Sequence, residues 1–332
     1  MTIRVVCYGL GPIGLGIARL AAARSGVAIV GAIDVDPHKA GQPLAALLGA
    51  GAPAGGDVIV SADAAATLAE AQPDAVLHAT SSSLASVRGQ LLQIIEAGAN
   101  VVSTCEELSF PWTAQPQLAA ELDAAARRAG VTLLGTGVNP GYAMDALPLM
   151  LTAPCAAVHA VRVLRVVDAA RRRGPLQRKV GAGLTPAEFD QRVQAGTVRH
   201  VGLPESLHML ATVLGWHLER TDDSIAAVLA DAPITTEFAQ VAAGQVAGVR
   251  QVARGFIGER EVLRLELRMY LGAPDPQDTV EIDGDPPVRM TIAGGLHGDV
   301  ATAAIAVNAL ASVVRAAPGL ASMGEVPLVH FW

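Results

Sequence analysis

Short apolar runs alternate with amphipathic stretches through the first 137 residues of the chain. Apolar runs of about four to eight residues are typical of strands buried in a parallel sheet, whereas apolar positions three and four apart are typical of helices. The predicted strands are Val5–Tyr8, Val27–Asp34, Val58–Val60, Ala75–Ala79, Asn100–Thr104 and Val131–Gly135. The predicted helices are Ile17–Ala23, a short one after residue 42, Ala64–Ala71, Val87–Ala97 and Gln115–Ala129, with a Gly/Ala/Pro-rich loop before Val58. This alternation predicts an α/β fold with a Rossmann-type doubly wound parallel sheet.

The pattern changes in the second half, where alternation typical of strands dominates. Thr185 and Glu188 form a capping-box pattern that predicts a helix to about Ala195. The other predicted elements are a strand over Ala156–Val167, a helix over Glu205–Glu219, strands over Gly244–Phe256, Val262–Tyr270, Thr279–Ile282 and Val288–Ile292, and a helix over Val300–Val314 with Asp299 as its cap. We therefore expect a Rossmann domain over residues 1–137, an α+β domain on a mostly antiparallel sheet for substrate and dimerisation over 138–298, and a helix and tail over 299–332 that return to the first domain.

Composition narrows the class of protein. The chain has 332 residues, 51% of them hydrophobic, and a formal net charge of -7. An acidic chain of this kind gives no electrostatic footprint for nucleic acid or an anionic membrane, and the short run Arg171–Arg173 is typical of a solvated loop. Three widely spaced cysteines, Cys7, Cys105 and Cys155, predict neither a disulfide framework nor a metal site, and a reducing cytoplasm fits them.

A glycine-rich turn follows the first predicted strand and leads into the first helix. Gly9 permits a tight exit from the strand, Gly11 lets the backbone approach a pyrophosphate, and Gly14 lets the helix pack against the strand. Pro12 and Ile13 lie between them, where the first N–H groups of a helix face bound phosphates. The turn predicts a dinucleotide site.

The second predicted strand ends in Asp34, at the spacing of a ribose-binding acid. A carboxylate there accepts hydrogen bonds from ribose hydroxyls and repels a 2′-phosphate, which favours NAD. NADP stays open, because His38 and Lys39 follow closely and offer positive charge, although polar residues of this kind are also common in solvent-facing turns.

Polar residues follow two further strands at the edge where ligands of parallel sheets bind. Thr80, Ser81 and Ser82 come directly after one strand and are candidates to contact the cofactor, or to cap the helix that begins near Leu84. Cys105 comes after the next strand and is a further candidate cofactor contact.

Two adjacent carboxylates, Glu106 and Glu107, come next among apolar and aromatic neighbours. A carboxylate in such surroundings can act as a base, or stay ionised and stabilise a cation. The structural alternative is that both cap a helix beginning at Pro111 and Trp112. After the last strand of the first domain, a turn enters a predicted helix with Asn139 as N-cap and Pro140 in its first position.

Four segments together resemble the 2,4-diaminopentanoate dehydrogenases and related native amine dehydrogenases, which share a distant fold relationship with dihydrodipicolinate reductase. They are Gly9–Gly14, Ser103–Ser109, Gly137–Asp145 and His200–Ser206. The resemblance spans nearly the whole chain. The eight histidines include no adjacent pair of the kind dihydrodipicolinate reductases carry.

The resemblance implies an NAD(P)-dependent enzyme that aminates a small ketone or aldehyde with ammonia, or deaminates an amine in reverse. It assigns the catalytic carboxylate to Glu106, with Glu107 as second choice. The expected substrate pocket consists of Val138, Asn139, Met144, Val167 and His200. A homodimer is also expected.

Three alternatives stay open. A substrate derived from an amino acid, such as 2,4-diaminopentanoate, or a cyclic imine would need a basic side chain to hold a carboxylate, for which Arg178 or Lys179 is available. A non-enzymatic sensor of NAD(P) would use the glycine turn and have no need of Glu106.

Overall fold

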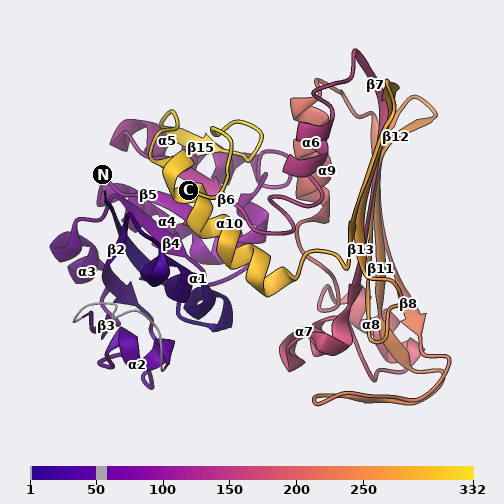
Figure 1. The fold of residues 1–332 in the computed structure, drawn as a ribbon, viewed down its shortest axis with the longest axis horizontal. Helices are drawn as coiled ribbons and strands as arrows, with labels where there is room; N and C mark the ends of the chain where they lie inside the picture. The colour runs from indigo at the N-terminus through magenta and orange to yellow at the C-terminus, as the bar shows by residue number, and fades with distance from the viewer. Residues whose placement is uncertain (1, 50–57) are drawn as a thin grey trace. The chain divides into compact units, whose positions relative to one another are not determined.

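The structure is a computed structural model that describes residues 2–49 and 58–332. The predicted Gly/Ala/Pro-rich loop lies largely on residues 50–57, outside the described residues. The chain divides into two compact units (Figure 1). Unit 1 comprises the chain up to Tyr142 together with His297–Trp332, and unit 2 comprises Ala143–Leu296.

Unit 1 is built on a sheet in which all described neighbouring strands are parallel. The strand order is β15-β6-β5-β4-β1-β2-β3, so the chain reverses direction across the sheet between β1 and β4. The strands are β1 (Ile3–Tyr8), β2 (Val27–Ile33), β3 (Val60–Ser61), β4 (Ala75–His78), β5 (Asn100–Ser103), β6 (Thr132–Gly135) and β15 (Gly319–Ala321). Ligands of such sheets bind at the carboxyl ends of the strands beside that reversal.

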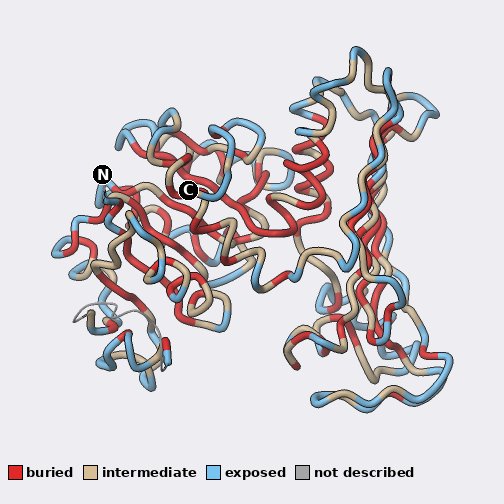
Figure 2. Tube along the Cα trace, in the orientation of Figure 1, coloured by how far each residue is buried: buried red, intermediate tan, exposed pale blue. Residues whose placement is uncertain are grey.

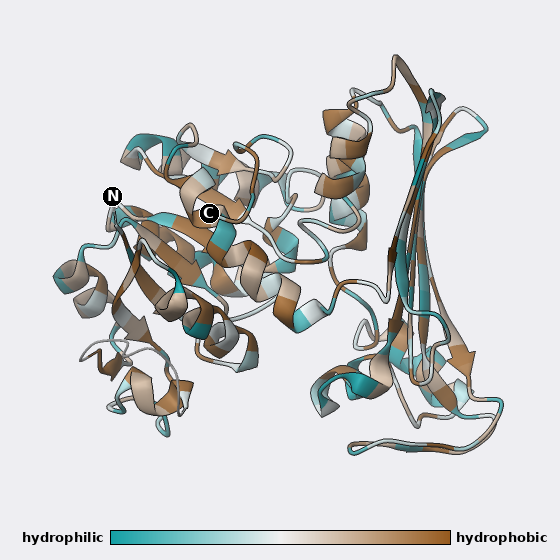
Figure 3. Ribbon diagram, in the orientation of Figure 1, coloured by the Kyte–Doolittle hydropathy of each residue, from teal (hydrophilic) through white to brown (hydrophobic). Residues whose placement is uncertain are grey.

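Helices cover both faces of this sheet. They are α1 (Pro12–Ala23), α2 (Leu44–Leu48), α3 (Ala64–Ala71), α4 (Leu84–Glu96), α5 (Pro116–Ala129) and α10 (Gly298–Val313), with a 3-10 turn over Glu106–Leu108. Val5 and Cys7 of β1 pack with α1, α2 and α10, whereas Val6 and Tyr8 pack with α3, α4 and α5. Burial on both faces explains why these strands read as continuous apolar runs, and it confirms the predicted doubly wound sheet (Figures 2 and 3).

The last helix, α10, belongs to the core of unit 1. Its Ala306 and Leu310 are fully buried in one hydrophobic cluster with Ile17 and Ala21 of α1. Asp299 lies inside the first turn of α10 and does not cap it, because the helix begins one residue earlier and His297 is the N-cap.

Unit 2 is built on a six-stranded sheet of order β14-β13-β7-β12-β11-β8 among the described residues. Its neighbours pair antiparallel except for β7 and β12, which are parallel, so the predicted mostly antiparallel sheet is confirmed. The strands are β7 (Ala157–Asp168), β8 (Arg220–Leu229), β11 (Val246–Ile257), β12 (Arg260–Tyr270), β13 (Gln277–Asp285) and β14 (Val288–Ala293), with a separate pair β9 (Ile234–Thr235) and β10 (Gln240–Val241). The helices are α6 (Ala146–Leu151), α7 (Gly174–Lys179), α8 (Pro186–Gln194) and α9 (Leu203–Val213), with a 3-10 turn over Ala169–Arg171.

The two faces of this sheet differ in chemistry. Val161 and Val163 of β7 are buried on one face, and their partners on β12 are Leu263 and Leu265, which are also buried. The alternate residues of the same strands form a charged face, on which Arg162 lies opposite Arg264. One face therefore belongs to the core, and the other carries charges.

Several predicted boundaries are wrong. The helix start suggested at Pro111 is a turn, whereas α5 begins at Pro116, within one residue of the start predicted at Gln115. The helix predicted at Pro140 begins instead at Ala146, after Gly141 with a φ of 122°, a conformation that a helix cannot continue. The helix predicted to Glu219 ends at Val213. Strand β8 was not predicted, because it is an edge strand whose mostly exposed residues lack an apolar alternation.

Candidate active site

The glycine turn after β1 has the geometry of a dinucleotide site. Gly9 has a φ of 90°, and a Cβ there would meet the carbonyl oxygen of Ala79 at 2.5 Å. A Cβ on Gly14 would lie 1.7 Å from the Gly9 carbonyl oxygen, so the close packing of helix on turn requires glycine. A Cβ on Gly11, in contrast, would meet nothing within 4 Å, which leaves its backbone open to a ligand.

The first turn of α1 is suited to an anion. Gly11 is its N-cap and supplies no side-chain hydrogen bond, and Pro12 and Ile13 are the first two helical residues. The amide groups of that turn therefore have no side-chain acceptor at the N-cap, as a pyrophosphate site requires.

Asp34 follows the end of β2 and is engaged on both carboxylate oxygens. Its Oδ2 accepts from the Leu10 backbone N–H at 2.7 Å and from Lys39 Nζ at 3.1 Å, and its Oδ1 accepts from the Asp36 N–H at 2.9 Å. Burial acts to raise the pKa of Asp34, but these hydrogen bonds and the Lys39 charge outweigh burial, so the pKa is lowered. Asp34 is therefore ionised at neutral pH and holds the glycine turn against the loop that follows β2.

Lys39 lies beside the two acids Asp34 and Asp36, and the backbone N–H of His38 also contacts Asp36. Lys39 Nζ lies 3.1 Å from Asp34 and 3.4 Å from Asp36, and these partners raise its pKa although burial acts to lower it. The N–H of His38 donates to Asp36 Oδ1 at 2.9 Å. A cation thus stands next to the predicted ribose-binding carboxylate.

The hydroxyl residues after β4 make hydrogen bonds with several partners. Thr80 Oγ1 donates to Gln90 Oε1 at 2.7 Å, and Ser81 Oγ accepts from the Ser83 N–H at 3.2 Å. The carbonyl oxygen of Ser82 accepts from Cys105 Sγ and from the Glu107 N–H, each at 3.3 Å. The loops after β4 and β5 are therefore joined through Ser82.

Cys105 is buried, and burial raises the pKa of its thiol to about 12. The thiol is neutral at physiological pH and is not a nucleophile. It serves as a donor to the Ser82 carbonyl within the loop.

The structure separates the roles of the two adjacent glutamates. Glu107 Oε2 accepts from the Leu84 N–H and from Gln115 Nε2, each at 2.8 Å. It thereby caps α4, whose N-cap Ser83 makes no side-chain cap bond. The carboxylate of Glu106, by comparison, makes no hydrogen bond or ion pair with any residue the structure describes. The predicted capping of a helix at Pro111 is therefore wrong for both glutamates, because that segment is a turn; Glu107 caps α4 instead.

The predicted pocket residues are divided between the units. Val138 and Asn139 lie in unit 1, and both are buried. The Val138 N–H donates to Thr302 Oγ1 at 3.2 Å, and both polar atoms of the Asn139 side chain are buried without a described partner. A buried amide in that state is available to a ligand.

The other three residues lie in unit 2. Met144 is fully buried, and Val167 packs against a hydrophobic cluster that contains Val180 and Phe189. The backbone N–H of His200 donates to Gln251 Oε1 at 3.0 Å, and its Nδ1 is buried without a described partner. The pocket that these five residues were predicted to form stays a prediction.

His200 lies in an electropositive environment. Burial and nearby positive charges together lower the pKa of the ring to about 3; the charges belong to Lys179, Arg165, Arg172 and Arg199. Arg165 is paired with Asp278 and Arg199 with Asp223, whereas Lys179 has no ion-pair partner among the described residues.

Known proteins are similar to this chain over almost its whole length. The family model of the 2,4-diaminopentanoate dehydrogenase C-terminal domain matches residues 142–332. A 2,4-diaminopentanoate dehydrogenase of Acetoanaerobium sticklandii is 31% identical over 98% of this chain and 94% of that protein. The chain belongs to the 2,4-diaminopentanoate dehydrogenase family.

Further relatives of this 2,4-diaminopentanoate dehydrogenase family member are amine dehydrogenases. One from Streptomyces virginiae is 27% identical, covering 98% of this chain and 96% of the relative. The solved amine dehydrogenase of Mycobacterium smegmatis is 29% identical with a TM-score of 0.88, covering 100% of this chain and 98% of that one. The family member is accordingly an oxidoreductase of the dehydrogenase class.

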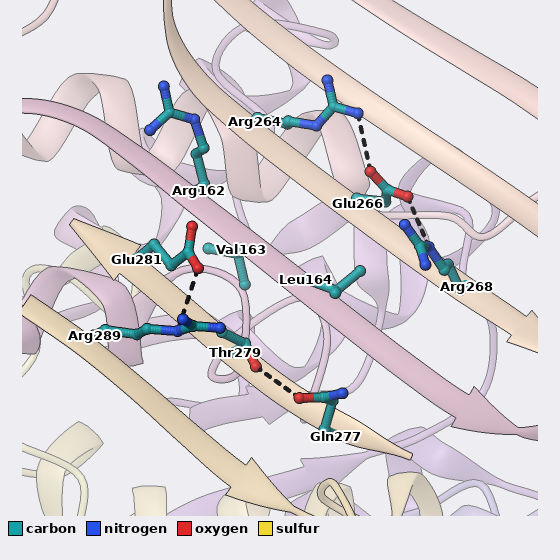
Figure 4. A pocket seen from close by; sticks show the side chains of 10 residues that line it. All are labelled: Arg162, Val163, Leu164, Arg264, Glu266, Arg268, Gln277, Thr279, Glu281 and Arg289. Atoms are coloured by element: carbon teal, nitrogen blue, oxygen red, sulfur yellow. Dashed lines mark hydrogen bonds and ion pairs between the residues drawn. The ribbon is translucent and has the colours of Figure 1, made fainter. Parts of the chain in front are cut away.

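A hollow of the family member lies on the charged face of the unit 2 sheet (Figure 4). It encloses about 270 Å³. Glu266 lies within it and accepts from Arg250, Arg264 and Arg268 at 2.7 to 3.0 Å. Burial acts to raise the pKa of Glu266, but the three guanidinium groups lower it to about 2. None of the predicted site residues lines this hollow, so it is not the candidate catalytic site.

Sequence reasoning missed features that depend on three-dimensional contacts. The capping of α4 by Glu107 joins residues 23 apart, so no local motif signals it. The sequence did offer one hint of the Lys179 charge near His200, because Arg178 and Lys179 form a short basic pair. Arg178 is exposed, and its charge is not among those that act on His200.

No helix among the described residues is long and apolar enough to cross a membrane. No group of three or more His, Cys, Asp or Glu side chains in residues 2–49 and 58–332 could hold a metal ion.

Proposed function

We propose that this protein is an NAD(P)-dependent amine dehydrogenase that aminates a small ketone or aldehyde with ammonia and, in reverse, deaminates an amine. The observation that carries the proposal is the carboxylate of Glu106, which follows the end of β5 at the ligand-binding edge of the sheet and has no described partner. The Streptomyces virginiae and Mycobacterium smegmatis relatives, named as amine dehydrogenases, support the same reaction.

Glu106 has two tasks in this reaction. An ionised carboxylate removes a proton from ammonium, which must be neutral to attack the carbonyl carbon. The same charge then stabilises the iminium that forms after water leaves. One such interaction in a water-shielded site is worth on the order of 3 kcal/mol, or about a hundredfold in rate.

NAD(H) is the proposed cofactor, and NADP(H) is the alternative; either supplies or accepts the hydride when bound. Gly9, Gly11, Pro12, Ile13 and Gly14 fit its pyrophosphate, because the backbone is open at Gly11 and the helix start has no side-chain cap.

The remaining contacts of the cofactor site are assigned by position. Asp34 is proposed for the ribose, and Thr80, Ser81, Ser82 and Cys105 for the nicotinamide side of the sheet edge. A protein of gentamicin A biosynthesis that was solved in complex with NAD shares this fold, at 21% identity and a TM-score of 0.51.

The proposed substrate pocket consists of Val138, Asn139, Met144, Val167 and His200. Val138 is small and leaves room for an apolar substituent, and Asn139 offers a buried amide without a described partner. The lowered pKa makes the ring of His200 a weak base, which suits a pocket wall better than a general base.

A carboxylate-bearing substrate, such as 2,4-diaminopentanoate, is a second candidate. The charge of Lys179, unpaired among the described residues, acts on the buried ring of His200. An ammonium in such a position attracts a substrate carboxylate. Lys179→Met should then raise KM for a keto acid about tenfold and leave KM for a ketone of equal length unchanged, with Arg178→Met as the control.

We further propose a homodimer in a reducing cytoplasm. The charged face of the unit 2 sheet carries both signs of charge, and Arg162 on it has no ion-pair partner among the described residues. The three cysteines are free thiols, which fits a reducing compartment. Sedimentation compares the oligomeric state of wild type with that of Arg162→Glu. A dimer in wild type that is lost in the variant would support this face as the dimer interface.

The experiment that tests the reaction compares two variants with wild type. NADH and NADPH oxidation is measured with a panel of ketones and aldehydes in ammonium buffer, for wild type, Glu106→Gln and Glu107→Gln. We expect ammonia-dependent turnover to fall about a hundredfold in Glu106→Gln, with thermal stability unchanged, and to persist in Glu107→Gln. Tight cofactor binding without ammonia-dependent turnover of any carbonyl would leave a cyclic-imine reductase or a non-enzymatic sensor.

A further inference from the structure

His78, the last residue of β4, lies at the centre of a buried hydrogen-bond network in unit 1. The residue is fully buried, and it pairs across the sheet with Ser103, the last residue of β5. His78 Nδ1 lies 2.8 Å from Ser103 Oγ. On the other side of the ring, Nε2 lies 2.8 Å from Gln90 Oε1 and 2.9 Å from Thr80 Oγ1.

The partners determine where the protons lie. Gln90 Oε1 can only accept, and it already accepts from the Thr80 hydroxyl at 2.7 Å, so His78 Nε2 carries the proton. His78 Nδ1 is then an acceptor for the Ser103 hydroxyl. Ser103 Oγ in turn accepts from the Cys105 backbone N–H at 3.1 Å. The hydrogen bonds therefore all run in one direction. The Cys105 N–H donates to Ser103, the Ser103 hydroxyl donates to His78 Nδ1, and His78 Nε2 donates to Gln90.

The ring is neutral, as this arrangement requires. Burial lowers the pKa of His78 to about 4, although the hydrogen bond to Gln90 acts to raise it. At neutral pH the ring therefore keeps one proton and one acceptor nitrogen.

The network ends on the two loops that carry the proposed active-site residues. Cys105 is the N-cap of the 3-10 turn that begins at Glu106. The Thr104 N–H also donates to the His78 carbonyl oxygen, at 2.9 Å. Thr80, at the other end, is a proposed cofactor contact.

We propose that His78 is a positioning residue that sets the place of Glu106 through Ser103 and the place of Thr80 through Gln90. The proposal rests on the proposed function of Glu106. A misplaced catalytic group lowers kcat without weakening the binding of the cofactor, whereas a misplaced cofactor contact raises KM for the cofactor. The Ser103 branch should therefore affect kcat, and the Gln90 branch should affect KM for the cofactor.

Two replacements of His78 separate the branches. In His78→Asn the amide oxygen stands near the place of Nδ1 and still accepts from Ser103, whereas the reach to Gln90 and Thr80 is lost. In His78→Gln an amide N–H still reaches Gln90, whereas the acceptor for Ser103 is lost. Ser103→Ala removes both the donor to His78 Nδ1 and the acceptor for the Cys105 N–H, and leaves the Gln90 side of the ring in place. Ser312→Ala is the matched control, because Ser312 is equally buried in unit 1 and its hydroxyl donates to the Leu328 carbonyl.

We expect Ser103→Ala and His78→Gln to lower kcat about tenfold and to change KM for the cofactor by less than about twofold. His78→Asn should keep kcat within about threefold of wild type and raise KM for the cofactor. A kcat for Ser103→Ala equal to that of Ser312→Ala would overturn the proposal.

A spectroscopic measurement tests the network apart from activity. In protein labelled with ¹⁵N-histidine, the signal absent from His78→Asn should be a neutral ring with its proton on Nε2 from about pH 5 to pH 8. A proton on Nδ1 would overturn the proposal. The Cys105 amide should also exchange at least about tenfold faster in Ser103→Ala than in Ser312→Ala.

The outcomes distinguish this proposal from the proposed function. If wild type shows no ammonia-dependent turnover, the function of Glu106 fails, and the tautomer and the Cys105 exchange rate still decide whether His78 positions this loop. If turnover is present and both of those measurements fail, His78 has only a packing role.

Discussion

The carboxylate of Glu107 accepts a hydrogen bond from the backbone N–H of Leu84 at 2.8 Å, across 23 residues of sequence. This contact joins the turn after β5 to the first residue of α4. It also leaves Glu106, the neighbour of Glu107, as the carboxylate of the two that has no described partner.

Loss of this cap should cost stability and little activity. We expect Glu107→Ala to lower the free energy of unfolding by about 1 kcal/mol, because α4 loses a charged acceptor at its N-terminus and Gln115 loses its partner. Urea unfolding measures the effect, with Glu106→Ala as the control that should unfold like wild type. Equal stability of all three proteins would contradict the capping role.

The pair Asp34 and Lys39 should determine the choice between the two nicotinamide cofactors. In Asp34→Ser the carboxylate that repels a 2′-phosphate is gone, and Lys39, 3.1 Å from it in the wild type, keeps Asp36 at 3.4 Å as its remaining acidic partner and becomes available to that phosphate. The ratio of kcat/KM for NADPH to that for NADH should rise about tenfold or more. The double variant Asp34→Ser with Lys39→Met should lose most of this gain; an undiminished gain would show that Lys39 has no part in it.

Local patterns predicted the elements of the nucleotide-binding half well. Its strands are buried on both faces and are therefore continuous apolar runs, and its glycines are required by contacts within the turn itself. Helix α3, over Ala64–Ala71, has the predicted bounds, and the capping box of Thr185 forms in α8. The errors occurred where contacts between residues far apart in the sequence determine the secondary structure. Strand β8 exists only because it pairs with β11, and the helix expected at Pro140 is displaced to Ala146, where Asp145 caps it at 2.7 Å.

From spacing alone, the proposed catalytic carboxylate was predictable only to the pair Glu106 and Glu107, and the family resemblance then named Glu106 as the first choice. Sequence placed Glu106 and Glu107 at the edge of the sheet, and spacing could not separate two neighbours. The bond from Leu84 to Glu107 separates them, and it depends on how α4 packs beside β5. The network around His78 was missed for the same reason, since its members come from β4, β5 and α4.

Acid should destabilise unit 2 through Glu266. The three arginines lower its pKa from 4.5 to about 2, so the folded state binds the proton less tightly than the unfolded state. The stability this provides is complete above about pH 4.5 and is lost as the pH falls toward about 2. We expect Glu266→Gln to be less stable than wild type at pH 7 and to approach wild type near pH 2, in urea unfolding across that range.

Glu281 provides the control for this titration, because it lies on the same face and its side chain is 45% exposed. Glu281→Gln should keep the acid dependence of wild type. A difference between Glu266→Gln and wild type that is independent of pH would assign the effect to packing.

The buried pair of Arg165 and Asp278 should be the most sensitive polar contact of unit 2. Both side chains are at most 3% exposed, and Arg165 Nη1 lies 2.9 Å from both carboxylate oxygens. Burial lowers the pKa of Arg165 and raises that of Asp278, so each charge is tolerated because of the other. The pair also binds both backbone polar groups of Leu296.

Asp278→Asn would leave the guanidinium of Arg165 buried without its counter-charge, and we expect it to lower the free energy of unfolding by about 3 to 5 kcal/mol. The double variant Arg165→Met with Asp278→Leu removes both charges and should recover most of that loss, because the cost arises from the unpaired charge. Chemical unfolding of the two variants beside wild type makes the comparison. A double variant as unstable as Asp278→Asn would mean that the bonds to Leu296, which both variants weaken, are what stabilises this part of unit 2.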